Sequence, residues 1–230
     1  MEDSGSKVVP HFQEALEELK ARLLVMGGEA EEQVRSAVCA LVERDAGRAR
    51  EVLEGDTTIN RLHLEIDERC FKLLALHQPM AVDLRVIVSA IKINSDLERV
   101  GDFAVNISEA ALHHLKHPAV KPLIDIPSMA DIAQGMLRDA LNAYVMHDVG
   151  LAEAVLDRDD ALDELKSRVF HDLLHFMRED AATTEPLLDL ILISRHLERI
   201  GDHATNIAEE VIFIASGRDV RHHAQEGGVG

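Results

Sequence analysis

Large aromatic side chains are almost missing from this 230-residue chain, which has no Trp, one Tyr and 3% aromatic residues in all. Its interior must therefore be packed mainly with aliphatic side chains. Hydrophobic residues make up 47% of the sequence, which is enough for a substantial core. Leu, Ala, Glu, Ile and Val are abundant. This composition favours helices over strands.

Cysteine is nearly as rare, with only Cys39 and Cys70 present. Each lies inside an apolar helical pattern, and neither has a second thiol at the spacing of a metal or redox motif. A disulfide framework and a zinc ribbon are therefore not indicated, and the composition fits a reducing compartment. We expect a cytoplasmic protein.

Long apolar runs and signal sequences are also lacking. No uninterrupted apolar stretch approaches the roughly 18 residues that a transmembrane helix needs. The N-terminus, Met1 to Ser4, has neither the basic region nor the apolar core of a secretion signal. Any association with a membrane is therefore expected to depend on a partner protein.

Positive charge is scarce, since 24 Lys and Arg residues face 42 Asp and Glu residues, for a net charge of −18. No basic stripe interrupts the acidic surface, which argues against a nucleic acid partner. Acidic surfaces suit metal cations or a basic protein partner, although strong negative charge also serves simply to keep a protein soluble.

Helical periodicity of apolar residues is the main positive signal, and it predicts six long helices. Gly27 and Gly28 fall inside the first, which they should weaken or bend because each Gly costs about 1 kcal/mol relative to Ala in a helix. The predicted helices cover residues 11–44, 46–77, 81–115, 128–148, 151–178 and 184–216.

A proline-rich segment separates the first three helices from the last three. Pro118, Pro122 and Pro127 lie within residues 117–127 and cannot continue a helix, so we place a linker there. The predicted units are a first three-helix bundle at 10–116 and a second at 128–216. The polar, glycine-rich tail at 217–230 is expected to be flexible.

An internal repeat relates the two halves. Residues 97–109 align without gaps on residues 197–209, with nine of thirteen positions identical. A second match places Asp56 and Asn60 beside Asp159 and Asp163. Duplication of one unit explains both matches. We therefore predict an all-α protein of two tandem three-helix bundles related by internal pseudo-symmetry.

Oxygen-bearing side chains gather on one face of the third and sixth predicted helices. Glu98, Asp102 and Asn106 lie within an arc of about 80°, opposite an apolar stripe. The simplest interpretation is an ordinary solvated face. Three features favour a ligand instead: upstream residues at the same angle are apolar, Gly101 and Gly201 recur inside the helices, and no Lys or Arg follows the acids at i+4.

Two carboxylates one turn apart can converge on a hard cation, and an Asn oxygen can complete its coordination. Oxygen donors favour Mg, Mn, Ca or Fe over a structural zinc site, although His203 beside Asp202 leaves the second copy less clear. The candidate metal ligands are Asp56, Asn60, Glu98, Asp102 and Asn106, here called the first acidic row, and Asp159, Asp163, Glu198, Asp202 and Asn206, the second acidic row.

Enzyme signatures are absent from the sequence. It contains no Glu-x-x-His motif of di-iron bundles, no phosphate-binding glycine loop, no G-x-S-x-G and no His-Glu-x-x-His. We therefore predict no catalytic residues. Arg85, Arg99 and Arg199 could contact phosphate, but in an acidic helical protein such residues more often pair with carboxylates, so no direct phosphate site is predicted.

The paired Leu-Glu-Arg-[Val/Ile]-Gly-Asp-x-Ala-x-Asn-Ile blocks, with Gln78-Pro79-Met80-Ala81 ahead of the first, resemble the PhoU family over about residues 10–216. The resemblance implies two symmetric three-helix bundles whose Glu98/Asp102 and Glu198/Asp202 pairs match motifs that bind multinuclear metal clusters in some relatives, and the expected metal is Fe, Mn, Mg or Zn. It also implies a negative regulator that links the ATPase subunit of a phosphate ABC transporter to a sensor histidine kinase. We further expect a homodimer.

Two other functions remain open from the residues alone. A metal-dependent hydrolase could hold two metals between the paired carboxylates and activate a water, but no candidate base is evident. A purely structural scaffold would leave both acidic rows without a ligand. The two rows also differ in charge, because Asn60 in the first corresponds to Asp163 in the second.

Overall fold

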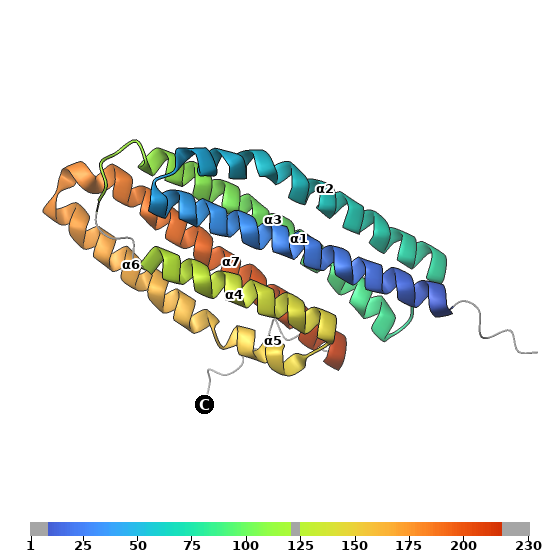
Figure 1. The fold of residues 1–230 in the computed structure, drawn as a ribbon. Helices are drawn as coiled ribbons and strands as arrows, with labels where there is room; N and C mark the ends of the chain where they lie inside the picture. Colours follow the sequence, from blue (N-terminus) through green and yellow to red (C-terminus); the bar gives the residue numbers. More distant parts are fainter. Residues whose placement is uncertain (1–8, 121–124, 218–230) are drawn as a thin grey trace, which may run out of the picture.

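The computed structural model describes residues 9–120 and 125–217, and within these ranges every regular element is helical (Figure 1). This confirms the predicted all-α class. The elements are α1 (Val9–Glu43), α2 (Ala46–His77), α3 (Val82–His114), α4 (Asp125–Met146), α5 (Val149–Leu156), α6 (Asp159–Glu179), a 3-10 turn (Ala181–Thr183) and α7 (Thr184–Ser216).

The first half forms a three-helix unit from α1, α2 and α3, and the second half repeats it with α4, the α5 and α6 pair, and α7 (Figure 1). The turns that open the second helix of each unit also correspond. Arg44 and His147 both have positive φ, at 56° and 54°. Asp45 accepts hydrogen bonds from the amides of the next helix, as Asp148 does. The pseudo-symmetry therefore extends to the local turn chemistry.

The single helix predicted at 151–178 is wrong, because a break at Asp157 and Arg158 divides it into α5 and α6. The Arg158 guanidinium bonds to Asp139 on α4, and its Nε donates to the Ala154 carbonyl at 3.2 Å. Asp has a low helix propensity in helix interiors. It is favoured in the first turn, where it lies near the positive end of the helix dipole. The break therefore places Asp159 at the start of α6.

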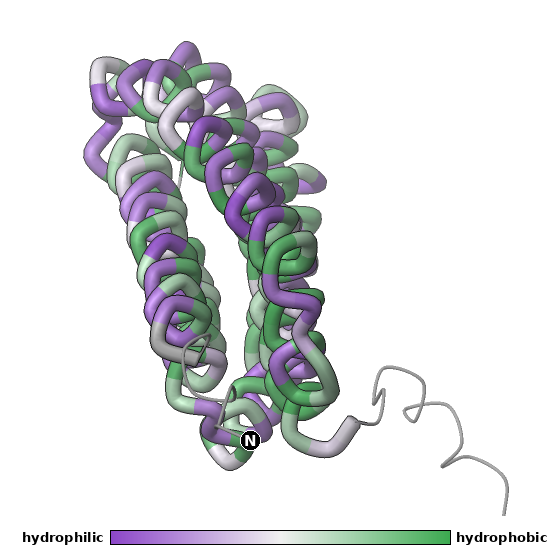
Figure 2. Tube along the Cα trace, turned by 90° about the vertical axis from the view of Figure 1, so that its right-hand side faces the viewer, coloured by the Kyte–Doolittle hydropathy of each residue, from purple (hydrophilic) through white to green (hydrophobic). Residues whose placement is uncertain are grey.

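One apolar cluster runs through both halves, because α3 packs along α7 and α1 packs along α4. Figure 2 shows hydrophilic and hydrophobic residues alternating around the long helices, as amphipathic helices require. Tyr144, the sole Tyr, is fully buried, and its hydroxyl donates to the Val86 carbonyl at 3.3 Å across the two units. The two repeats thus share a core.

Two predicted boundaries can be compared with the structure. The expected helix start at Ser128 is wrong, since Pro127 already lies in the first turn of α4. Proline is tolerated there because the first amides of a helix have no intrahelical acceptor. Pro118 follows the end of α3, whereas Pro122 and the tail beyond Gly217 lie outside the described residues.

The glycine pair in the first predicted helix does not interrupt it, since α1 continues through both residues. A Cβ at Gly27 would overlap the Leu141 side chain of α4, whereas one at Gly28 would meet nothing within 4 Å. Gly27 therefore allows α1 and α4 to pack closely. In the described part of the chain, none of the helices combines the length and the apolar character that a bilayer span requires.

Candidate metal-binding helix faces

The first acidic row lies along α2 and α3. Glu98, Asp102 and Asn106 on α3 are half-buried, as is Asp56 on α2, while Asn60 is exposed. The Asn60 amide donates to Asp56 Oδ2 at 2.6 Å. This bond turns the Asn60 nitrogen toward Asp56 and leaves the amide oxygen as the donor that Asn60 can offer to a cation.

The second acidic row lies along α6 and α7. Asp159 and Asp163 come from the first two turns of α6, and Glu198 and Asp202 come from the middle of α7. Lys166 reaches across from α6, and its Nζ donates to Glu198 Oε1 at 2.7 Å and to Asp163 Oδ1 at 3.4 Å. The Lys166 ammonium group therefore forms hydrogen bonds with two carboxylates of the row.

Burial and crowding of negative charge raise the pKa of two carboxyls in the second acidic row. Burial raises the pKa of Asp159 above its ordinary value, and the charges of Asp202 and Asp163 raise it further. Partial burial of its carboxyl likewise raises the pKa of Asp202, although the residue as a whole is exposed. Repulsion from Glu198 and Asp163 adds to this rise, and His203 and Lys166 oppose it. Deprotonation of this row therefore costs folding free energy that a bound cation could offset.

The recurring glycines have a packing explanation. A Cβ at Gly101 would lie 2.8 Å from Ile59 Cδ1 of α2, and a Cβ at Gly201 would overlap Leu162 of α6. Ile59 and Leu162 occupy corresponding positions in the two repeats. The close approach inferred from the sequence is thus made by an aliphatic side chain, so these glycines are not evidence for a bound ligand.

Basic side chains contact the acids of both rows, although none follows them at i+4. Arg99 Nη1 lies 3.3 Å from Asp102 Oδ2, and its Nε lies 3.9 Å from Glu98 Oε2. Lys166 plays this part in the second acidic row. The i+4 spacing identifies neither Arg99 nor Lys166. Arg99 precedes Asp102 by three residues and Lys166 follows Asp163 by three, so a spacing of three in either direction identifies both.

Asn206 and His203 face the other repeat. The Asn206 amide donates to Asp96 Oδ1 on α3 at 3.3 Å, and His203 Nδ1 lies 2.7 Å from the same oxygen. The His203 ring also lies 5.6 Å from the Phe103 ring. The structure therefore directs Asn206 and His203 toward the α3 and α7 interface, while the four carboxylates of the second acidic row gather between α6 and α7.

The carboxylates of the second acidic row are close enough to repel one another, yet neither row forms a closed coordination shell. Over residues 9–120 and 125–217, no group of three His, Cys, Asp or Glu ligand atoms within 4.8 Å of one another falls in either row. A cation would have to draw the side chains together and displace Lys166 from the second acidic row. The oxygen-only donor set suits hard cations, and burial together with repulsion between carboxylates raises the pKa values of Asp159 and Asp202 there.

The three arginines considered as phosphate ligands are engaged within the protein. Arg99 pairs with Asp102, which confirms the expected carboxylate pairing for that residue. Arg85 Nε donates to the Ile214 carbonyl near the end of α7 at 3.1 Å. Arg199 lies over the Phe103 ring, 5.8 Å from its centroid. The three guanidinium groups do not converge on a common site in these contacts.

Comparison with known proteins places these features in a family. The PhoU domain model matches the chain twice, at residues 23–111 and 126–211. A Pseudomonas putida protein named phosphate-specific transport system accessory protein PhoU homolog is 41% identical over 92% of this chain and 83% of its own length. A protein of the same name from Aquifex aeolicus is 38% identical over 93% of this chain and 97% of its own length.

Solved structures agree with this result. The crystal structure of PhoU from Pseudomonas aeruginosa superposes with a TM-score of 0.86 at 38% identity, covering 90% of this chain and all of that one. The phosphate transport system regulatory protein PhoU from Streptococcus pneumoniae gives a TM-score of 0.85 at 29% identity, over 91% and 99% of the two chains. With two domain matches, close relatives and the same fold, the chain belongs to the PhoU family.

Proposed function

We propose that this chain is a cytoplasmic negative regulator of phosphate uptake. In this proposal it links the ATPase subunit of a phosphate ABC transporter to a phosphate-sensing histidine kinase and holds the starvation response off, without catalysing a reaction. The observation that carries the proposal is the match of relatives along nearly the whole chain to accessory proteins of phosphate-specific transport. The absence of a spanning helix among the described residues is consistent with a role that reaches the membrane through partners.

The acidic rows are proposed to bind divalent or trivalent cations. The second acidic row offers four carboxylates, Asp159, Asp163, Glu198 and Asp202, whereas the first offers Asp56, Glu98 and Asp102 with amide oxygens. Repulsion within the second acidic row supports this proposal, because a cation would add to the positive charge that Lys166 provides there. We expect the second acidic row to bind more tightly, since it carries one more carboxylate.

Replacement of Asp202 by Asn should raise the free energy of unfolding without metal and should reduce the stabilisation that Mn²⁺ provides. Without metal, the variant should be more stable at pH 7, because the substitution removes repulsion between carboxylates. Solvent screens this repulsion, so the gain should be no more than about 1 kcal/mol. A carboxyl whose folded pKa is raised costs stability above that pKa, so the gain should disappear as the pH falls below its ordinary value of 3.8. Urea unfolding from pH 3 to 8 measures this effect.

With Mn²⁺ at ten times its dissociation constant, the wild-type chain should gain about 1.4 kcal/mol of stability, and Asp202→Asn should gain much less. Asp172→Asn is a matched control, because Asp172 is an exposed residue of α6 outside the row. Equal stabilisation of wild type and Asp202→Asn by Mn²⁺ would show that the ion binds elsewhere.

The adaptor role predicts recovery of both partners with the chain. A tagged copy, expressed in its own host on phosphate-rich medium, should retain the transporter ATPase subunit and the histidine kinase from detergent-solubilised membranes. Deletion of the gene should switch on a phosphate-starvation reporter at high phosphate. A chain that recovers neither partner, in cells where the reporter stays off after deletion, would contradict the proposed role.

A variant in which all seven carboxylates of the two acidic rows are replaced by amides separates the two parts of the proposal. Its substitutions are Asp56→Asn, Glu98→Gln, Asp102→Asn, Asp159→Asn, Asp163→Asn, Glu198→Gln and Asp202→Asn. We call it the row-neutral variant. Retention of both partners by this variant would assign the adaptor role to surfaces other than the acidic rows, whereas loss of the partners together with loss of metal would link the two.

A further inference from the structure

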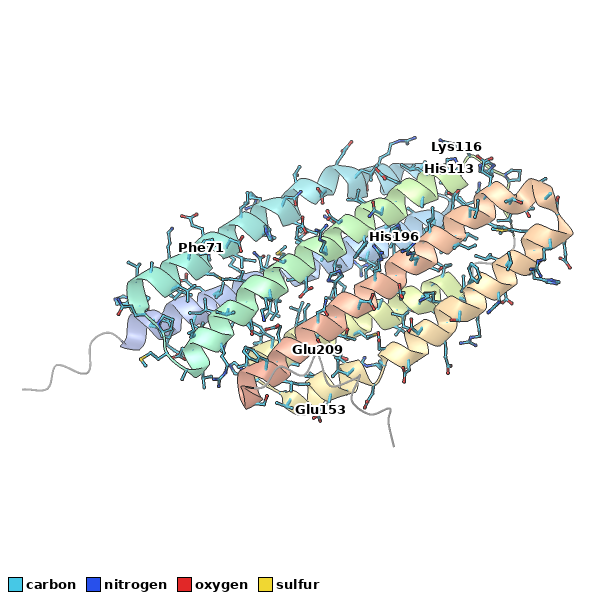
Figure 3. All side chains as sticks on the ribbon, turned by 180° about the vertical axis from the view of Figure 1, so that it is seen from behind. Phe71, His113, Lys116, Glu153, His196 and Glu209 are labelled. Atoms are coloured by element: carbon cyan, nitrogen blue, oxygen red, sulfur yellow. The ribbon has the colours of Figure 1, made fainter. Side chains whose placement is uncertain are left out.

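Two histidines and a glutamate meet at the end of the bundle where α3 finishes and α7 begins. His113 lies in the last turn of α3, His117 follows it by four residues, and Glu185 lies in the first turn of α7. Figure 3 labels His113 at this end of α3, beside the start of α7. One ligand atom from each of the three residues lies within 4.8 Å of the others. The group therefore joins the first repeat to the second.

The distances within the group are near those of a coordination shell. His113 Nε2 lies 3.8 Å from Glu185 Oε1, and His117 Nε2 lies 4.0 Å from Glu185 Oε2. Zinc bonds to N and O of about 2.0–2.2 Å place tetrahedral ligand atoms about 3.3–3.6 Å apart. Shifts of roughly 0.5–1.5 Å would thus close the shell. Glu185 can supply them, because its side chain is 68% exposed.

A buried carboxylate orients one of the histidines. His113 Nδ1 lies 2.8 Å from Asp189 Oδ2, and Asp189 is only 7% exposed. An ionised carboxylate can only accept a hydrogen bond, so His113 donates through Nδ1, and in the neutral ring the lone pair is on Nε2, which faces Glu185. Metal-binding histidines commonly have such a carboxylate partner, which sets the ring orientation and raises its basicity.

The backbone around the group is held by contacts from three elements. Buried His114 places its Nδ1 2.9 Å from the Pro186 carbonyl at the start of α7. Arg44, in the turn between α1 and α2, donates from Nη2 to the carbonyls of Leu115 and His117 at 3.1 Å and 2.6 Å. These bonds fix the chain that carries both imidazoles, and the carboxylates of Glu185 and Asp189 offset the charge that Arg44 brings nearby.

We propose that His113, His117 and Glu185 form a binding site for a first-row transition-metal dication of the zinc type, with water completing the coordination and Asp189 as a positioning residue. Two imidazoles and one carboxylate suit Zn²⁺, Co²⁺ or Fe²⁺ and disfavour Mg²⁺ and Ca²⁺, which prefer oxygen donors. The site is separate from both acidic rows. A bound cation would tie the end of α3 to the start of α7 across the repeats.

Zinc titration of the full-length row-neutral variant tests this site without a contribution from the acidic rows. Calorimetry should detect one Zn²⁺ per chain. Co²⁺ should give the visible absorption bands of a four- or five-coordinate ion, while Mg²⁺ should give no signal. Adding His117→Ala or Glu185→Gln should weaken Zn²⁺ binding at least tenfold, as Asp189→Asn should, because loss of an outer partner alone costs about 10–100-fold.

His175→Ala is the matched control, since His175 and Glu179 form an exposed pair at 3.3 Å that is not part of the three-residue group. It should leave Zn²⁺ affinity unchanged. Circular dichroism melts check that each variant folds. Zn²⁺ binding with an unchanged constant in the folded His117→Ala variant, or no Zn²⁺ binding by the row-neutral variant, would overturn the proposal. Neither result depends on the adaptor role or on metal in the acidic rows.

Discussion

Replacement of Glu210 by Ala should lower the free energy of unfolding by about 2–4 kcal/mol. Glu210 on α7 is 2% exposed. Its Oε2 accepts from the Ser89 hydroxyl and its Oε1 from Lys92 Nζ, both at 2.8 Å and both from α3. The substitution leaves a buried hydroxyl and an ammonium without their acceptor at the interface between the repeats.

The expected loss is below the full value for a buried ion pair, because the Lys92 side chain is 36% exposed and can turn to solvent. Urea unfolding of the wild type and the variant measures the difference. Glu109→Ala is the control, since Glu109 is an exposed glutamate on α3, and it should change stability by no more than about 0.5 kcal/mol. Similar midpoints for Glu210→Ala and Glu109→Ala would rule out a stabilising role for the cross-repeat pair.

The same Gly to Ala substitution should have opposite effects at two helix positions. At Gly201, the new methyl group overlaps Leu162, which is 1% exposed and closely packed, so we expect a loss of about 1–2 kcal/mol. At exposed Gly28 it meets nothing within 4 Å, so Ala should stabilise the helix by about 0.5–1 kcal/mol. The two variants should therefore differ by about 1.5–3 kcal/mol in urea unfolding.

Leu162→Ala provides a further check on the cause. Alone it should destabilise the chain by about 2–5 kcal/mol through a cavity. Combined with Gly201→Ala, the added methyl group occupies part of that cavity, and the two effects should fall short of additivity by about 1 kcal/mol. Strict additivity, or stabilisation by Gly201→Ala, would mean that Gly201 is not required for close packing.

Periodicity and self-similarity predict the helical class, the duplication and the oxygen-bearing helix faces, although the structure directs Asn206 toward α3. These features depend on side chains within a turn or two of one another, or on a match between segments, and both can be read along a single chain. The break at Arg158 was missed, because the bond that holds it goes to Asp139 on another helix. The helical pattern by itself continues through that position.

The sequence by itself determined the helical class, the repeated unit and the type of side chain on each helix face, because backbone hydrogen bonds and amphipathic burial are local. Only the tertiary structure decided which faces meet. It placed Leu162 against Gly201, Lys166 among the carboxylates of the second acidic row, and His203 against Asp96. Glu185 likewise reaches His113 only through the packing of α7 against α3, since 72 residues separate them and no local pattern encodes that distance.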